Sequence, residues 1–164
     1  MKYLNKLKKE LENLDVYFVG CSETEIKTIQ DKLIPEKKFP ECYKEFLSDM
    51  GKDMDRKEGN DRGYLVGNSV FISDLESNNS TDGLKGLLLE DESSLEITGN
   101  DFVFYGSQGF LYAFFKLDEG DNPPVYAYEE GFEGEAFPKI AESLSGFYER
   151  YLEGDKMLFS ELRS

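Results

Sequence analysis

The chain has 164 residues and a formal net charge of −15 at pH 7, with 39% hydrophobic residues, two cysteines and no histidine. This length and hydrophobic content fit one domain, 1–164, and the missing histidine excludes Ser-His-Asp and Cys-His nucleophile systems and zinc sites that need an imidazole. We predict a cytoplasmic protein without disulfides, because there are few cysteines and no apolar signal segment over 1–15. We also predict no membrane partner, since no apolar run is long enough to cross a membrane.

The first 50 residues predict three helices. Ser22 and Glu25 have the spacing of a capping box and start the second helix, which Pro35 ends. The third helix is predicted from Pro40, which suits the first helical position, to Gly51, which suits the position after the last turn. The first helix is indicated by leucines spaced three and four residues apart, which are Leu4, Leu7, Leu11 and Leu14.

The middle of the chain changes to strand patterns after a charged loop predicted over 52–63. Strands are predicted at 64–66, 70–72, 87–89, 102–105, 110–116 and 125–128. The strand 110–116 is apolar on both faces, which is typical of a strand near the centre of a sheet covered on both sides. A last helix is predicted from Pro138 to Gly154. This order predicts an α+β fold, in which a single, largely antiparallel or mixed sheet of about five to six strands packs with N-terminal and C-terminal helices.

Several segments together resemble the SUKH superfamily. The segment 39–47, FPECYKEFL, followed by Gly51, is similar to the Pro-initiated helix near the start of that family. The segments 102–106 and 110–112 are similar to its central strand pair, and the resemblance covers about 22–152. It implies a compact α+β domain that acts by binding proteins. Bacterial members are mostly immunity proteins that neutralise toxins, many of them nucleases, and a yeast relative is an adaptor that regulates cell-wall synthesis.

The negative charge is concentrated in one region. Positions 74–135 hold 15 Asp and Glu residues against Lys85 and Lys116, so this segment carries −13 of the net −15. Such a surface repels phosphates, which excludes nucleic acid as a favourable partner and favours a basic protein. The alternative is that these acids only solvate loops and keep the protein soluble.

Two acidic groups flank the strand 125–128, and we expect them to converge on one partner-binding surface. Phe132 is expected to add an aromatic anchor within the second group. The predicted surface covers the face of a basic toxin, such as a nuclease, which must itself be basic to hold phosphate. The candidate residues are Asp118, Glu119 and Asp121 before the strand, and Glu129, Glu130, Phe132, Glu133 and Glu135 after it.

Other functional hypotheses remain open at this stage. One is an intracellular adaptor of cell-wall synthesis or of another resident enzyme. A second is an enzyme that uses paired carboxylates, although acids at this density form close pairs by chance, so we predict no enzyme and no catalytic residue. A third is calcium in the 118–121 loop; we predict neither a metal site nor a cofactor. Cys21 and Cys42 are expected to be buried as small hydrophobic residues.

Overall fold

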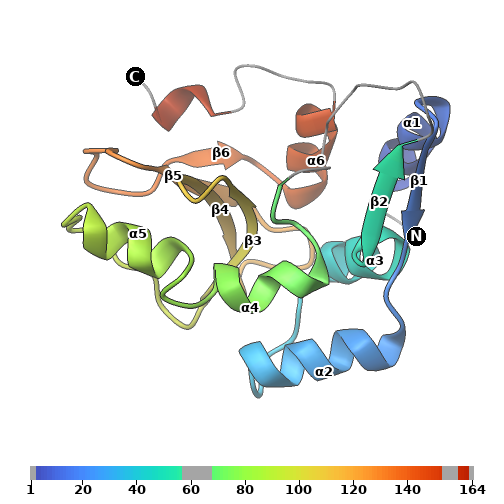
Figure 1. Cartoon of the computed structure of the whole chain (residues 1–164), viewed down its shortest axis with the longest axis horizontal. Coiled ribbons are helices and arrows are strands. Elements are labelled where there is room, and N and C mark those ends of the chain that lie inside the picture. Colours follow the sequence, from blue (N-terminus) through green and yellow to red (C-terminus); the bar gives the residue numbers. More distant parts are fainter. Residues whose placement is uncertain (1–2, 57–67, 153–158, 163–164) are drawn as a thin grey trace.

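The computed structural model describes residues 3–56, 68–152 and 159–162, and Figure 1 shows how their elements are arranged. In chain order these elements are α1 (Asn5–Asn13), β1 (Val16–Val19), α2 (Glu23–Leu33), α3 (Glu41–Met50), β2 (Asp53–Arg56), η1 (Ile72–Asp74), α4 (Leu75–Asn78), α5 (Leu84–Glu90), β3 (Asp101–Ser107), β4 (Leu111–Lys116), β5 (Val125–Glu129), β6 (Lys139–Ala141), α6 (Leu144–Leu152) and η2 (Ser160–Leu162). The α+β class is confirmed. Among the described residues, no helix is both long enough and apolar enough to cross a membrane.

The strands form two antiparallel sheets instead of the single sheet that the sequence predicts. One sheet has four strands in the order β3-β4-β5-β6, and the other pairs β1 with β2. The outer edge of β3 is already occupied, because the Asn79 side chain bonds both backbone groups of Val103: its Oδ1 accepts from the Val103 N–H at 2.8 Å and its Nδ2 donates to the Val103 oxygen at 2.9 Å. Ser69 forms a β-bridge with Gly106 further along the same edge. Strands β1 and β2 pair with each other and are not part of the four-stranded sheet.

The N-terminal helices follow their sequence signals closely. The Ser22 hydroxyl accepts from the Glu25 backbone N–H at 3.1 Å, and the Glu25 carboxylate accepts from the Ser22 N–H at 3.0 Å, which confirms the capping box. Pro40 occupies the N-cap position of α3, one residue before the first helical position predicted for it, and the helix begins at Glu41. Gly51 ends α3 with a φ of −77°, so its role is not a left-handed turn. A side chain there is excluded by space, since a Cβ would lie 2.5 Å from the Leu47 Cα.

Two predicted strands are wrong, and part of one predicted loop forms a strand. The segment 87–89 lies in α5, because Leu84, Leu87 and Leu88 are spaced as one helical face and are buried together. The segment 70–72 runs from an extended stretch into the 3₁₀ turn η1, and 64–66 falls outside the described residues. The predicted loop over 52–63 contains strand β2.

The last helix begins later than Pro138. Residues Lys139–Ala141 form β6, which pairs with β5 through Val125 and Tyr126. Helix α6 starts at Leu144, and the Ser143 hydroxyl accepts from the Gly146 backbone N–H at 3.1 Å. Ser143 therefore caps the start of α6, which the sequence analysis had placed at Pro138. The predicted end at Gly154 lies outside the described residues.

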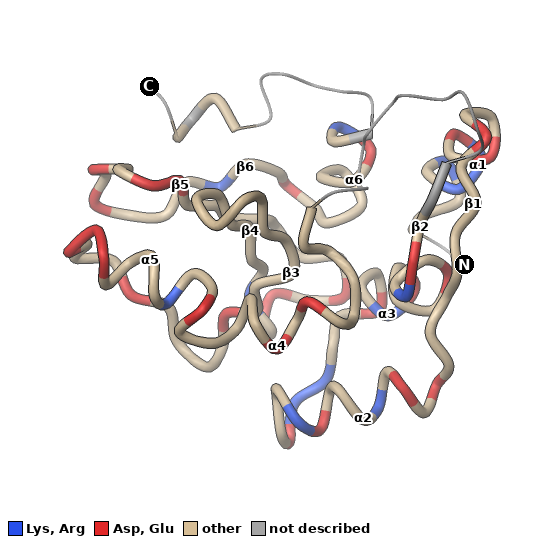
Figure 2. The backbone as a smooth tube through the Cα atoms, in the orientation of Figure 1, with Lys and Arg blue, Asp and Glu red and all other residues tan. Residues whose placement is uncertain are grey.

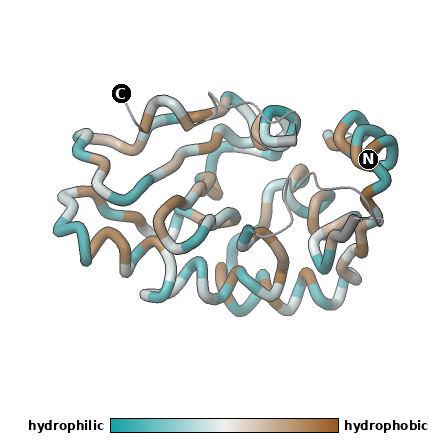
Figure 3. Tube along the Cα trace, turned by 45° about the horizontal axis from the view of Figure 1, so that its top comes forward, coloured by the Kyte–Doolittle hydropathy of each residue, from teal (hydrophilic) through white to brown (hydrophobic). Residues whose placement is uncertain are grey.

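Both faces of the four-stranded sheet are covered, as the pattern of 110–116 predicts. On one face Leu111, Ala113 and Phe115 join a large cluster that includes residues of α1, α3 and α6. On the other face Tyr112 and Phe114 join a smaller cluster with the buried leucines of α5. Hydrophobic and hydrophilic positions alternate along the helices and strands (Figure 3).

The large cluster is built from aromatic rings around Phe104. The ring centroid of Phe104 lies 5.3 Å from Phe147 and 5.4 Å from Phe115, and Phe46 stacks on Tyr148 at 4.6 Å. Both cysteines are buried and free, as expected. Burial raises the pKa of the Cys21 thiol to about 11 and that of Cys42 to about 12, so both stay protonated and unreactive near neutral pH.

Candidate functional site

The two acidic groups flanking β5 lie at opposite ends of that strand. The first group, Asp118, Glu119 and Asp121, is in the loop between β4 and β5, and the second follows β5. Because β4, β5 and β6 are antiparallel neighbours, successive loops leave from opposite ends of the sheet. The expectation that both groups converge on one surface is therefore wrong, and Figure 2 shows them as two separate acidic stretches.

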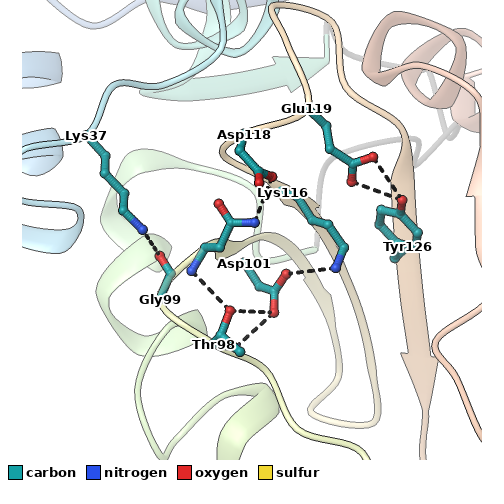
Figure 4. A network of polar contacts seen from close by, with 9 residues as sticks. Lys37, Thr98, Gly99, Asp101, Lys116, Asp118, Glu119 and Tyr126 are labelled. Atoms are coloured by element: carbon teal, nitrogen blue, oxygen red, sulfur yellow. Dashed lines mark hydrogen bonds and ion pairs between the residues drawn. The ribbon is translucent and has the colours of Figure 1, made fainter.

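The first group is tied into polar contacts near basic residues (Figure 4). Asp118 accepts from the Asn100 amide at 2.8 Å, and Glu119 accepts from the Tyr126 hydroxyl at 3.0 Å. Burial, followed by the hydrogen bond to Glu119, raises the pKa of Tyr126 to about 12. The Lys116 ammonium lies 3.8 Å from the Asp101 carboxylate and 5.4 Å from the centre of the Tyr126 ring. These charges mainly hold the loop against the sheet.

An open groove of about 430 Å³ lies beside this first group, where the 118–121 loop meets the start of α3. The Asp121 backbone oxygen accepts from the Cys42 N–H at 2.9 Å, which docks the loop on the helix. Lys37 and Lys38 line the groove together with Asp118 and Asp121. Since both signs of charge meet here, this end of β5 is less selective for a cationic partner than a surface of acids alone.

The second group joins three further acids to form what we call the acidic tip. Glu130, Glu133 and Glu135 are exposed in the loop after β5. At the end of α5 the consecutive residues Glu90, Asp91 and Glu92 lie beside that loop (Figure 2). The acidic tip is defined as Glu90, Asp91, Glu92, Glu130, Glu133 and Glu135; Glu129, the half-buried last residue of β5, adjoins it.

Asp91 holds the two halves of the acidic tip together. Its carboxylate accepts from the Gly131 backbone N–H at 2.9 Å and from the Tyr128 hydroxyl. Burial and this bond raise the pKa of Tyr128 to about 12, so the hydroxyl remains a donor over the physiological range. The sequence analysis missed Glu90, Asp91 and Glu92. The available signal was the run of three acids directly after the leucines of α5.

Phe132 lies within the acidic tip but its ring packs inward. It is half-buried, and its centroid lies 6.1 Å from that of Tyr128 in an edge-to-face arrangement. A Cβ on Gly134 would come within 2.3 Å of the Phe132 ring, so the ring covers this glycine. Phe132 thereby fixes the loop that carries Glu130 and Glu133. Its expected role as a direct anchor for a partner stays a prediction.

The carboxylates of the acidic tip have no cationic partner in the part of the chain that the structure describes. The ion pairs recorded there join other acids, mostly on α1, α2 and α3. Within the same described ranges, no cluster of three or more Cys, Asp or Glu side chains has the geometry to hold a metal ion. Within the described part of the chain, the acidic tip therefore presents to solvent a negative charge that no ion pair neutralises.

Glu92 occupies a backbone position that favours glycine. Its φ is +52°, and the Ser93 N–H donates to the Leu88 oxygen at 3.0 Å while the Glu92 N–H donates to the Leu89 oxygen at 3.1 Å. These two bonds form a Schellman motif, whose left-handed residue is usually glycine because a side chain is strained there.

We expect Glu92→Gly to raise the free energy of unfolding by about 0.5–1 kcal/mol, because it relieves that strain. Glu90→Gly, two positions earlier, is the matched control. Glu90 is the last helical residue of α5, so glycine there is expected to lower stability by up to about 1 kcal/mol. Urea unfolding of both variants measures the two signs, and a loss of stability in Glu92→Gly would contradict the backbone argument.

Comparison with known proteins gives one family match. The model described as SMI1 / KNR4 family (SUKH-1) matches residues 20–150, which is most of the chain. No curated protein matches the sequence. The match covers every helix and strand from α2 to β6, and with them both acidic groups.

Proposed function

Because the chain belongs to the SMI1 / KNR4 family (SUKH-1), we propose that it is an immunity-type protein that binds and neutralises a basic toxin through the acidic tip. Domains of this family are generally non-catalytic and act through protein–protein contacts. The single observation that carries the proposal is the set of exposed carboxylates from α5 and from the loop after β5, which lie side by side and lack ion pairs among the described residues.

The charge of the acidic tip suits a partner that handles phosphates. A nuclease needs a cationic face to hold its substrate, and a surface of clustered carboxylates complements that face as phosphates do. Opposite fields also accelerate the encounter between the two proteins. At the far end of β5, we propose a secondary contact formed by Asp118, Glu119 and Asp121. It is secondary because Asp118 and Glu119 already accept hydrogen bonds and because basic residues lie nearby.

The backbone at Glu92 also supports a role for the acidic tip in binding. A glycine would relieve the left-handed conformation, yet the position carries a carboxylate next to Glu90 and Asp91. Stability alone favours the smaller residue at this position. Left-handed non-glycine residues are often found at functional sites, and Glu92 is one of four such residues in the described ranges, with Asp15, Glu36 and Gln108.

The proposal is tested by protection of cells. A candidate toxin is identified as a basic protein that co-purifies with the chain, and it is then expressed with and without the chain in the same host. We expect the cells to survive only when the chain is present. We also expect the toxin to lose its activity in the purified complex. The triple variant Glu130→Lys, Glu133→Lys, Glu135→Lys serves as the loss-of-protection control.

Two outcomes would contradict the proposal. A toxin that binds the chain but still kills the cells would show that binding does not neutralise it. A non-toxic resident enzyme as the stoichiometric partner would instead indicate the adaptor function that the sequence analysis left open.

A further inference from the structure

Helix α5 carries the most exposed large hydrophobic side chain among the described residues. Leu84, Leu87 and Leu88 are buried against the sheet, whereas the side chain of Leu89 is 73% exposed. The other two exposed large hydrophobic residues in those ranges, Tyr17 at 50% and Val19 at 43%, lie on β1. A single exposed leucine is ordinary on a protein surface, so its surroundings decide what it means.

Leu89 borders an open groove of about 290 Å³. Its apolar wall combines Leu88 and Leu89 of α5 with Leu95 and Ile97 of the segment that leads to β3. The full lining is Thr81, Lys85, Leu88, Leu89, Ser93, Leu95, Glu96 and Ile97. Pockets for small ligands enclose most of the ligand surface, whereas this groove is open, so it suits one side chain that protrudes from a partner.

The groove is continuous with the acidic tip. Glu90 follows Leu89 directly, and Glu92 precedes Ser93 of the lining. The Schellman motif fixes this turn, and Asp91 ties it to the loop that carries Glu130. The groove, whose lining also holds Lys85 and Glu96, therefore adjoins carboxylates that have no ion pair within the described ranges, so that apolar and acidic surfaces lie next to each other as they do in protein interfaces.

We propose that this groove receives an apolar side chain, leucine or phenylalanine, from a segment of a basic partner protein in which Lys or Arg residues flank that side chain. The proposal rests on the proposed function and specifies how its partner is held. The net charge of −15 disfavours a second copy of the chain at this site. The same charge disfavours an anionic lipid surface, so complementarity selects the basic segment.

The test uses the full chain and two synthetic peptides. One peptide carries a central leucine between pairs of lysines, and the other has serine in place of the leucine. Fluorescence anisotropy measures both affinities, and an NMR titration of the labelled chain locates the contact. We expect the leucine peptide to bind about tenfold more tightly than the serine peptide, since burying one leucine has about that effect. The resonance shifts are expected to centre on 81–97.

Leu89→Gln removes the most exposed side chain of the apolar wall while keeping helix propensity, and it is expected to reduce the difference between the two peptides. Val19→Thr, an exposed apolar-to-polar change on β1, is the matched control and should leave the tenfold difference unchanged. Equal binding of the two peptides, binding of neither, or an unchanged preference in Leu89→Gln would overturn the groove proposal. Equal binding that disappears when the acidic tip is reversed would still support the proposed function, because charge would then carry recognition alone.

Discussion

Reversing three charges of the acidic tip, in the variant Glu130→Lys, Glu133→Lys, Glu135→Lys, is expected to weaken binding of the basic partner about a hundredfold. All three side chains are exposed in the loop after β5. An exposed pair contributes up to about 1 kcal/mol, so three lost pairs correspond to about 3 kcal/mol, or roughly two powers of ten in Kd. Surface plasmon resonance with the partner identified by co-purification measures the change.

The matched control for this variant is Glu12→Lys, Glu23→Lys, Glu36→Lys, which alters the net charge by the same amount at exposed sites away from the acidic tip. We expect it to lower the association rate modestly, with little change in the dissociation rate. The association rate of the natural chain is also expected to fall with rising salt, and the tip variant should show a weaker salt dependence. Equal losses in the two triple variants would mean that net charge, and not the acidic tip, attracts the partner.

The largest expected change in stability comes from Phe104→Ala, which removes the ring at the centre of the aromatic core. Phe104 is fully buried, and its ring contacts those of Tyr43, Phe115, Phe147 and Tyr148. Removing a buried phenylalanine costs about 3–5 kcal/mol, because the surrounding rings cannot collapse fully into the space. A domain of this size is stable by only about 5–15 kcal/mol, so the urea midpoint should fall steeply.

Phe110→Ala is the control for that change. Phe110 is half-exposed before β4 and packs only against the margin of the same cluster. It buries less apolar area, so the expected loss is about 1–2 kcal/mol. Equal losses in the two variants would contradict the central position given to Phe104.

Features set by neighbouring residues could be predicted from the sequence. The capping box at Ser22 and Glu25 needs only four consecutive positions, and the structure forms both of its bonds. The two-sided pattern of 110–116 likewise predicted a central strand, and β4 lies between β3 and β5 with a cluster on each face. In both cases the local pattern and the tertiary environment favour the same structure.

Features set by distant contacts could not be predicted. Strand β2, with the sequence Asp-Met-Asp-Arg, has no apolar alternation and exists because β1 pairs with it across two intervening helices. The three leucines at 87–89 fit either a strand or a helix. The structure forms a helix, in which Leu84 is buried on the same face as Leu87 and Leu88. The acidic tip depends on the bond between Asp91 and Gly131, which are 40 positions apart. The sequence therefore indicated the residues of the acidic tip in the loop after β5, but not those at the end of α5.

The amide of Asn79 has a consequence for self-association. An open sheet edge is a template on which another chain can add a strand and start a fibril. At Val103 this template is blocked, because the asparagine already uses both the donor and the acceptor that an incoming strand would need. Aggregation through the β3 edge would first have to displace that side chain, so one short polar residue protects a sheet rich in aromatic side chains from polymerising there.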